Sequence, residues 1–367
     1  MTLMKRIVAS LRWLVPVALV AGLATSGVAI AGASAPAQGG SATLNGSGST
    51  FQQPYNEQVI GAFKQKSPSV TINYSGGGSG KGRQDFADQV VDFAGTDAPY
   101  SASDAAGVKG GTFYYFPTVA GPITVSYNLS GVKKLQLSPE TLAKIFQGDI
   151  KTWDDPAIAA DNKGVKLPST PITVVHRSDS SGTTQNFTTF LNTAAPGVWT
   201  LGAGSTVSWP ADQQSGQGNP GVGQTVKSTD GGVGYVDFSD AKALKLKFAS
   251  VKNKDGKFVA PTLKGTTAAI DKTQVNQDLT YNPLNAPGAS AYPITSPTWI
   301  LAYQNYSDAS KGTAIKNFLN YIYGNGQKLA NSVDYAPLPK DLLNKAKAQV
   351  KQIGGSGGST SSSTPSS

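Results

Sequence analysis

The chain has 367 residues and a formal net charge of +9, yet only 14% of its residues are charged. Its basic residues form no dense run, so the sequence does not predict a nucleic-acid partner. It has no cysteine and a single histidine, His176, which excludes disulfides, zinc–thiolate sites and metal sites built from several histidines. We therefore expect a fold held together by its core, without a metal ion or other cofactor.

Residues 1–35 have the charge and hydropathy order of an export signal. An apolar stretch from Trp13 to about Gly32 follows a basic start and precedes the small residues 33–35. The sequence therefore predicts export to the periplasm, with cleavage near Ala35 and a short leader at 36–41. The alternative is an uncleaved membrane tether, because the apolar stretch is long enough to span a bilayer marginally. The absence of cysteine argues against a lipid-anchored form.

From residue 42 onward, strand-like and helix-like segments alternate. Repeated strand–helix units predict an α/β protein with mixed sheets flanked by helices, whose ligands bind at the carboxyl ends of the strands. Alternating and branched residues predict strands at 42–44, 70–74 and 91–95. The first intervening helix carries Tyr55, Val59, Ile60 and Phe63 on one face. A second helix is predicted through Phe86 and Val90.

The character of the sequence changes near residue 116. Residues 116–127 are extended and marked by prolines, and residues 292–303 form a similar stretch, so we expect the chain to cross between two domains there. A strand at 231–238 and a helix at 314–323 complete the ordered part. The predicted domains are 42–119 plus 293–353 (first, discontinuous) and 120–292 (second), followed by a disordered Gly/Ser-rich tail at 354–367.

The most informative motif is Arg177-Ser178-Asp179-Ser180-Ser181-Gly182-Thr183. A predicted strand ends just before it, and residues 184–191 can form a helix after it. The Ser-Gly-Thr residues would then offer free N–H groups at a helix N-terminus, which favours negative charge. Arg177 adds a planar fork of donors that matches two oxygens of a tetrahedral anion, and Asp179 is close enough to hold that fork. The motif predicts an oxyanion site and provides no evident nucleophile or base.

Two glycine-containing loops also follow predicted strands. In the loop 46–50, the Thr50 hydroxyl and the amides of Thr50 and Phe51 could face an anion, although such a loop is also a common helix cap. The loop 76–81 fails the spacing of a nucleotide-binding P-loop. It is therefore either a flexible turn or a loop in which Ser79 donates to the ligand.

Asp97 follows the strand predicted at 91–95. Besides a turn or cap role, its carboxylate could accept a hydrogen bond from a protonated ligand and repel an unprotonated one. Phosphate carries a proton at neutral pH and sulfate does not, so such a site would discriminate by roughly four to five orders of magnitude. His176 alternates with Arg177 along its strand and should point away from the site, which argues against a hydrolase with Ser181 as nucleophile.

Together with several other short blocks of the sequence, these motifs resemble the phosphate-binding proteins of bacterial phosphate ABC importers. The resemblance runs from about Leu44 to Leu343 and keeps its blocks in order along the chain, which makes it far more specific than any single loop. The blocks are 48–51, 78–80, 91–99, 153–158, 177–183, 234–238, 292–296 and 334–339.

The resemblance implies a two-domain, hinged α/β fold of the periplasmic-binding-protein architecture, with the ligand in the inter-domain cleft. It implies a monomer that binds inorganic phosphate and delivers it to the permease and ATPase subunits of an importer, without catalysing a reaction. The implied phosphate contacts are Thr50, Phe51, Ser79, Asp97, Arg177, Ser181, Gly182 and Thr183, with Asp179 paired to Arg177 to tune its charge.

Three other functions remain open on the sequence alone. The same scaffold could carry a secreted phosphatase, although the single histidine and the missing metal ligands argue against it. It could bind another oxyanion such as sulfate or molybdate, for which Asp97 would be a liability. Finally, it could be a surface-displayed interaction or scavenging protein in which the N-terminal segment and the tail matter more than the anion site.

Overall fold

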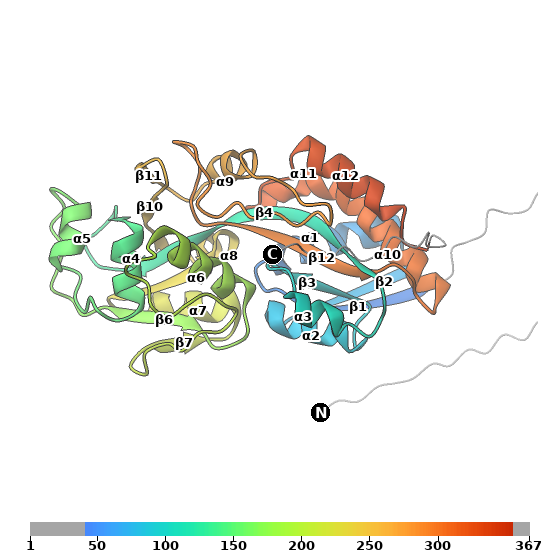
Figure 1. The fold of residues 1–367 in the computed structure, drawn as a ribbon, viewed down its shortest axis with the longest axis horizontal. Helices are drawn as coiled ribbons and strands as arrows, with labels where there is room; N and C mark the ends of the chain where they lie inside the picture. The colour runs from blue at the N-terminus through green and yellow to red at the C-terminus, as the bar shows by residue number, and fades with distance from the viewer. Residues whose placement is uncertain (1–40, 355–367) are drawn as a thin grey trace, which may run out of the picture. The chain divides into compact units, whose positions relative to one another are not determined.

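The computed structural model describes residues 41–354, which fold around a nine-stranded mixed sheet flanked by helices (Figure 1). The strand order is β2-β1-β3-β12-β4-β8-β6-β7, with β9 also paired to β4. The predicted signal at 1–35, the leader up to residue 40 and the tail from 355 lie outside the described residues. None of the helices within 41–354 is both long and apolar enough to cross a bilayer.

We call the part of the sheet on the β2 side the first half-sheet. Its strands are β2 (Val70–Gly76), β1 (Ala42–Gly48), β3 (Phe93–Thr96), β12 (Thr295–Tyr303) and residues 113–122 of β4 (Phe113–Asn128). Strand β1 lies between β2 and β3 and is parallel to both. The helices of these chain segments are α1 (Gln53–Lys66), α2 (Ser79–Ala87), α3 (Ala102–Ala106), α10 (Ala309–Tyr321), α11 (Gln327–Leu329) and α12 (Lys340–Val350), with a π-helical turn at Ile322–Gly326 and a 3-10 turn at Ala330–Val333.

The second half-sheet contains residues 123–128 of β4 together with β8 (Gly232–Asp237), β6 (Thr173–Arg177), β7 (Gln214–Gly216) and β9 (Lys247–Phe248). Strands β8, β6 and β7 are parallel. A separate small sheet has the order β11 (Phe258–Val259), β10 (Ser250–Lys252) and β5 (Gln136–Leu137). The remaining helices are α4 (Pro139–Phe146), α5 (Pro156–Asp161), α6 (Gly182–Ala194), α7 (Gly218–Ser228), α8 (Phe238–Ala243) and α9 (Leu263–Ile270).

Strand β4 belongs to both half-sheets. Residues 113–122 pair antiparallel with β12, which lies beside β4 in Figure 1, and residues 123–128 pair antiparallel with β8. This 16-residue strand is buried along almost its whole length. The predicted domain boundaries, 119/120 and 292/293, fall within β4 and just before β12, and they stay predictions.

The predicted elements are present, but their bounds differ. The strand predicted at 91–95 spans Phe93–Thr96, and the strand predicted at 231–238 ends at Asp237. The helix predicted through Val90 ends at Ala87, because Gln89 adopts a left-handed backbone (φ 59°) that a helix cannot include. The prediction that Val90 is helical is therefore wrong. The helix predicted at 314–323 begins earlier, at Ala309, and α10 ends at Tyr321 before the π-helical turn.

A close helix–strand contact fixes the start of α2. A Cβ atom added to Gly82 would lie 2.5 Å from the Cα of Gly48 and 2.8 Å from the carbonyl oxygen of Ser47. Only glycine allows α2 to approach the end of β1 this closely. The contact holds the N-terminus of α2, and with it Ser79, beside the loop that carries Thr50.

Candidate functional site

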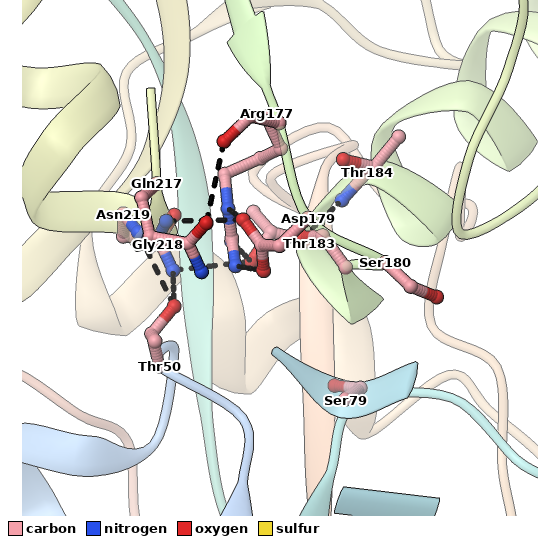
Figure 2. A network of polar contacts seen from close by, with 12 residues as sticks. Thr50, Ser79, Arg177, Asp179, Ser180, Thr183, Thr184, Gln217, Gly218 and Asn219 are labelled. Carbon is pink, nitrogen blue, oxygen red and sulfur yellow. Dashed lines mark hydrogen bonds and ion pairs between the residues drawn. The ribbon is translucent and has the colours of Figure 1, made fainter. Parts of the chain in front are cut away.

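The four polar loops come together at the carboxyl ends of strands. The loops with Thr50, Ser79 and Asp97 follow β1, β2 and β3 of the first half-sheet, and parallel pairing places them at one edge. The run 177–183 follows β6 of the second half-sheet. Figure 2 shows Arg177 and Thr183 on the same side as Asn219, with Thr50 reaching toward them. All eight predicted contact residues are buried.

Arg177 is held by an ion pair inside the protein. Its Nε donates to Asp179 Oδ1 at 2.7 Å, its Nη2 donates to Asp179 Oδ2, and its Nη1 donates to Thr183 Oγ1 at 3.3 Å. The two charged side chains are 1% and 7% exposed. Asp179 therefore pairs with Arg177, as predicted, and fixes the guanidinium plane. The backbone N–H of Gly218 donates to the same carboxylate at 3.0 Å, which ties the start of α7 to this pair.

The N-terminus of α6 lies beside Arg177. Ser181 is its N-cap, and the Ser181 hydroxyl accepts a hydrogen bond from the Thr184 N–H at 3.1 Å. This bond satisfies one of the first N–H groups of the helix and leaves those of Gly182 and Thr183. The predicted turn from strand to helix is confirmed.

The site concentrates backbone donors that the protein does not use. Among the described residues, no acceptor faces the N–H groups of Thr50, Phe51, Ser79, Gly182 and Thr183. Leaving a buried donor unpaired costs about 1–3 kcal/mol, and buried backbone groups in proteins are nearly always paired. Five such donors in loops of both half-sheets make this cluster the candidate site for an acceptor from outside the chain.

Asp97 is surrounded by hydroxyl groups. Ser49 Oγ donates to its Oδ1 and Oδ2, both at 2.6 Å, Thr298 Oγ1 donates to Oδ1 at 2.7 Å, and Ser79 Oγ donates to Oδ2 at 3.1 Å. A carboxylate offers about four lone-pair positions, and three hydroxyls do not fill them. Asp97 therefore keeps capacity to accept one further proton donor.

Two opposing effects act on the pKa of Asp97. Burial raises it, because the charged form loses its hydration, while hydrogen bonds from Ser49, Thr298 and Ser79 and the charge of Arg177 lower it. Burial dominates, so the pKa lies above its usual range. A proton shared between Asp97 and a bound acid is consequently easier to accommodate than on an exposed aspartate.

The two half-sheets touch at these loops. A Cβ atom on Gly182 would overlap with Ser79 Oγ and lie 2.7 Å from Asp97 Oδ2. The N–H of Gly80 donates to the carbonyl of Ser180 at 2.9 Å. Asn186 of α6 donates to the carbonyl of Asp97 at 2.7 Å. Residues 50, 97 and 177, far apart in the sequence, therefore belong to one contiguous cluster.

Several polar residues of this cluster escaped sequence reasoning. They are distant in the sequence from the residues that they contact, and none stands in a recognisable anion motif. Only Ser49 and Ser296 lay within blocks that the sequence singled out, and each could have been considered there. The missed residues are Ser49, Asn186, Asn219, Ser296 and Thr298.

His176 has a structural position. Its ring stacks on Trp209 with the ring centroids 5.1 Å apart, and its Nδ1 lies 2.9 Å from the Arg177 carbonyl oxygen. Burial lowers its pKa. The His176 ring therefore packs on Trp209, while the Arg177 side chain contacts Asp179 and Thr183, in line with the alternation predicted along β6.

A pair of carboxyl groups lies behind the site. Asp237 caps α8 by accepting from the Asp240 N–H at 3.0 Å, and its own N–H donates to Asn219 Oδ1. The Oδ2 atoms of both aspartates are buried and, within residues 41–354, have no hydrogen-bond donor. Burial, and then the charge of Asp240, raises the pKa of Asp237 well above its usual range. The pair is therefore suited to hold a proton.

Comparisons with known proteins show the family to which the chain belongs. A family model described as a PBP superfamily domain matches residues 33–325. The chain is 36% identical over 328 residues to phosphate-binding protein PstS 3 of Mycobacterium leprae, covering 86% of this chain and 88% of the relative. It is 38% identical over 331 residues to phosphate-binding protein PstS of Methanocaldococcus jannaschii, covering 83% and 85%. The chain belongs to the PstS family of phosphate-binding proteins.

The fold is the two-domain α/β fold of that family. A solved structure of the periplasmic phosphate-binding protein PfluDING with bound phosphate aligns with a TM-score of 0.71 and 25% identity, covering 84% of this chain and 93% of that one. A phosphate-binding protein from Stenotrophomonas maltophilia aligns with a TM-score of 0.67 at 22% identity, covering 84% and 93%, which shows the fold alone. The PstS-family resemblance stated from the sequence blocks is confirmed.

The carboxyl pair behind the site predicts an unusual pH dependence of stability. Because the pKa of Asp237 is higher in the folded than in the unfolded state, the folded state binds more protons, and its stability falls as pH rises above the unfolded value of about 4. Asp237→Asn keeps the capping oxygen and supplies an N–H to Asp240. We expect it to raise the free energy of unfolding at neutral pH by about 1–3 kcal/mol and to remove much of this slope.

Urea unfolding between about pH 4 and pH 8 measures both effects. The matched control is Asp155→Asn, since Asp155 caps α5 in the same way by accepting from the Ala157 N–H at 2.8 Å. An Asp237→Asn protein that is less stable than wild type at neutral pH would contradict the claim that ionisation of the buried Asp237–Asp240 pair destabilises the fold.

Proposed function

We propose that this protein binds inorganic phosphate outside the cytoplasmic membrane and delivers it to the permease and ATPase subunits of an ABC importer. The observation that carries the proposal is the set of five backbone donors without an acceptor in the described chain, together with the Arg177 guanidinium. These donors lie in loops that follow strands of both half-sheets. A tetrahedral oxyanion supplies acceptors in several directions at once, which is what such a set requires.

The charge balance favours capture by dipoles over capture by net charge. Arg177 is the cation among the predicted contact residues, and Asp179 neutralises much of its charge. Neutral N–H and O–H groups would therefore spread the ligand's charge, and hydrogen bonds to a charged partner contribute about 1.5–3 kcal/mol each. Many such bonds give tight binding that salt screens weakly, because the groups are buried.

Asp97 would select the ligand by its proton. The carboxylate has room for one more donor, and hydrogen phosphate has one to give. A sulfate oxygen placed there would meet a second acceptor, and two acceptors without a proton repel each other. Asp97 therefore supports phosphate over sulfate or molybdate as the ligand.

The site is arranged for binding without chemistry. The Ser181 hydroxyl is engaged as the cap of α6, and His176 is stacked against Trp209, so the described residues supply no base to activate that hydroxyl. The eight contacts proposed for phosphate are those named from the sequence: Thr50, Phe51, Ser79, Asp97, Arg177, Ser181, Gly182 and Thr183.

The proposed cycle uses the connection between the half-sheets. The chain would cross between the predicted domains, 42–119 plus 293–353 and 120–292, within β4 and just before β12. We propose that these domains open to admit phosphate and close over it. The contacts of Gly80 and Gly182 across the loops correspond to the closed state that a transporter would recognise. In this proposed cycle the protein acts as an exported, periplasmic monomer once residues 1–35 are removed.

Arg177→Ala should weaken phosphate binding at least about 30-fold. The substitution removes the cation from a buried charge contact with the bound anion, and the loss of such a contact costs about 2–5 kcal/mol. Tryptophan fluorescence titration and calorimetry with purified mature protein measure the affinity. Lys151→Ala removes an exposed cation paired with Asp212 and should leave affinity unchanged. Wild-type affinity in Arg177→Ala would remove this residue from the site, and a wild type that binds no phosphate would overturn the proposed function.

Asp97→Asn should lose preference for phosphate over sulfate, because an amide can donate to a sulfate oxygen where a carboxylate repels it. Competition titrations with sulfate and arsenate measure the preference. Asp85→Asn is the control, since Asp85 accepts from Ser47 Oγ and Lys81 Nζ outside the cluster and its loss should not alter selectivity. Unchanged selectivity in Asp97→Asn would count against the proposal that Asp97 selects phosphate by accepting a hydrogen bond from its P–OH group.

A further inference from the structure

Asn219 occupies the junction between the two sides of the site. It is fully buried at the start of α7, and neither the motifs nor the sequence blocks pointed to it. Its Nδ2 donates to Thr50 Oγ1 at 3.2 Å and to Thr183 Oγ1 at 3.2 Å (Figure 2). One side-chain amide thus links a hydroxyl of the first half-sheet to a hydroxyl of the second.

The orientation of this amide is fixed by its other end. The backbone N–H of Asp237 donates to Asn219 Oδ1 at 3.3 Å. A backbone N–H cannot accept a hydrogen bond, so the oxygen of the Asn219 amide must face Asp237. Its NH₂ group must then face the two threonines, and both of its N–H bonds are used.

The hydroxyl groups of Thr50 and Thr183 can act only as hydrogen-bond donors toward a ligand. Thr50 Oγ1 accepts from both the backbone N–H and the Nδ2 of Asn219. Thr183 Oγ1 accepts from Asn219 Nδ2 and from Arg177 Nη1. A hydroxyl has two acceptor positions and one proton, so both groups can only donate to whatever lies in front of them.

We propose that Asn219 is a positioning and specificity-determining residue that fixes Thr50 and Thr183 as obligate donors. This inference rests on the proposed function and deepens it. Ligand oxygens that meet these hydroxyls must be free of protons, while the one P–OH group is directed to Asp97. Asn219 therefore disfavours ligands that carry a further P–OH, such as dihydrogen phosphate.

Two substitutions separate this role from simple packing. Asn219→Asp keeps the volume but offers only acceptors when ionised, so the threonines would donate to it and not to the ligand. Asn219→Ala removes the amide and frees one acceptor position on each hydroxyl. The proposal predicts that Asn219→Asp weakens phosphate binding more than Asn219→Ala at about pH 8, with at least about a tenfold loss for Asn219→Ala. A packing role predicts the opposite order, because alanine leaves a cavity.

The pH dependence gives a second readout. At about pH 5.5 phosphate carries an additional P–OH group. In Asn219→Ala the freed threonine hydroxyls can accept a hydrogen bond from this group. The loss of affinity in Asn219→Ala relative to wild type should therefore be smaller at about pH 5.5 than at about pH 8. Calorimetric titration of inorganic phosphate at both pH values, with melting temperatures recorded in parallel, makes the comparison.

The matched control is Asn253→Ala. Asn253 is also buried, but its Nδ2 donates to the backbone carbonyls of Gly288, Ala289 and Ala291, so its loss should lower the melting temperature without changing phosphate affinity. Equal losses for Asn219→Ala at both pH values, affinities within twofold of wild type, or a larger loss in alanine than in aspartate would overturn the inference alone. If Asn219→Asp does not fold, the pH comparison of Asn219→Ala decides. Absence of phosphate binding by wild type would overturn the proposed function and the inference with it.

Discussion

Unpaired N–H groups buried where two half-sheets meet are the constraint on which the site depends. Parallel strands place the loops of Thr50 and Ser79 at one edge, and helix N-termini leave their first donors free. The glycines at 82 and 182 allow backbone to approach closely enough for these donors to converge. Each unpaired donor costs stability, so the arrangement is favourable only with an acceptor-rich ligand. We propose that capture of this ligand is coupled to closure of the two domains.

The polar groups around these donors control hydrogen-bond direction more than net charge. Asp179 neutralises Arg177, and hydroxyls surround Asp97. Asn219 fills both acceptor positions of the Thr50 hydroxyl and, together with Arg177, those of the Thr183 hydroxyl. The orientation of its own amide is set by the backbone N–H of Asp237. We propose that these groups present donors to the ligand, with the Asp97 carboxylate as the acceptor for its proton. Such an arrangement would distinguish oxyanions by where their protons are, which charge alone cannot do.

Local signals in the sequence were enough to predict the strands, the loops and the cluster of Thr50, Asp97 and Arg177, because strand periodicity and helix-cap motifs act over a few residues. The end of α2 was predicted wrongly, since the left-handed Gln89 leaves no local signal. Thr298 and Asn219 were missed because they contact residues 201 and 169 positions away. Such partners are set by sheet order, and a single sequence does not reveal it.

The central claim is that five backbone amides donate hydrogen bonds to a bound oxyanion. The NMR signals of these amides test the claim most directly. Amide ¹H–¹⁵N spectra of the mature protein should be recorded with and without inorganic phosphate. The account predicts downfield amide proton shifts and slowed hydrogen exchange at Thr50, Phe51, Ser79, Gly182 and Thr183, because each gains a charge-assisted hydrogen bond. Saturating phosphate that leaves these five signals unmoved while others shift would contradict it.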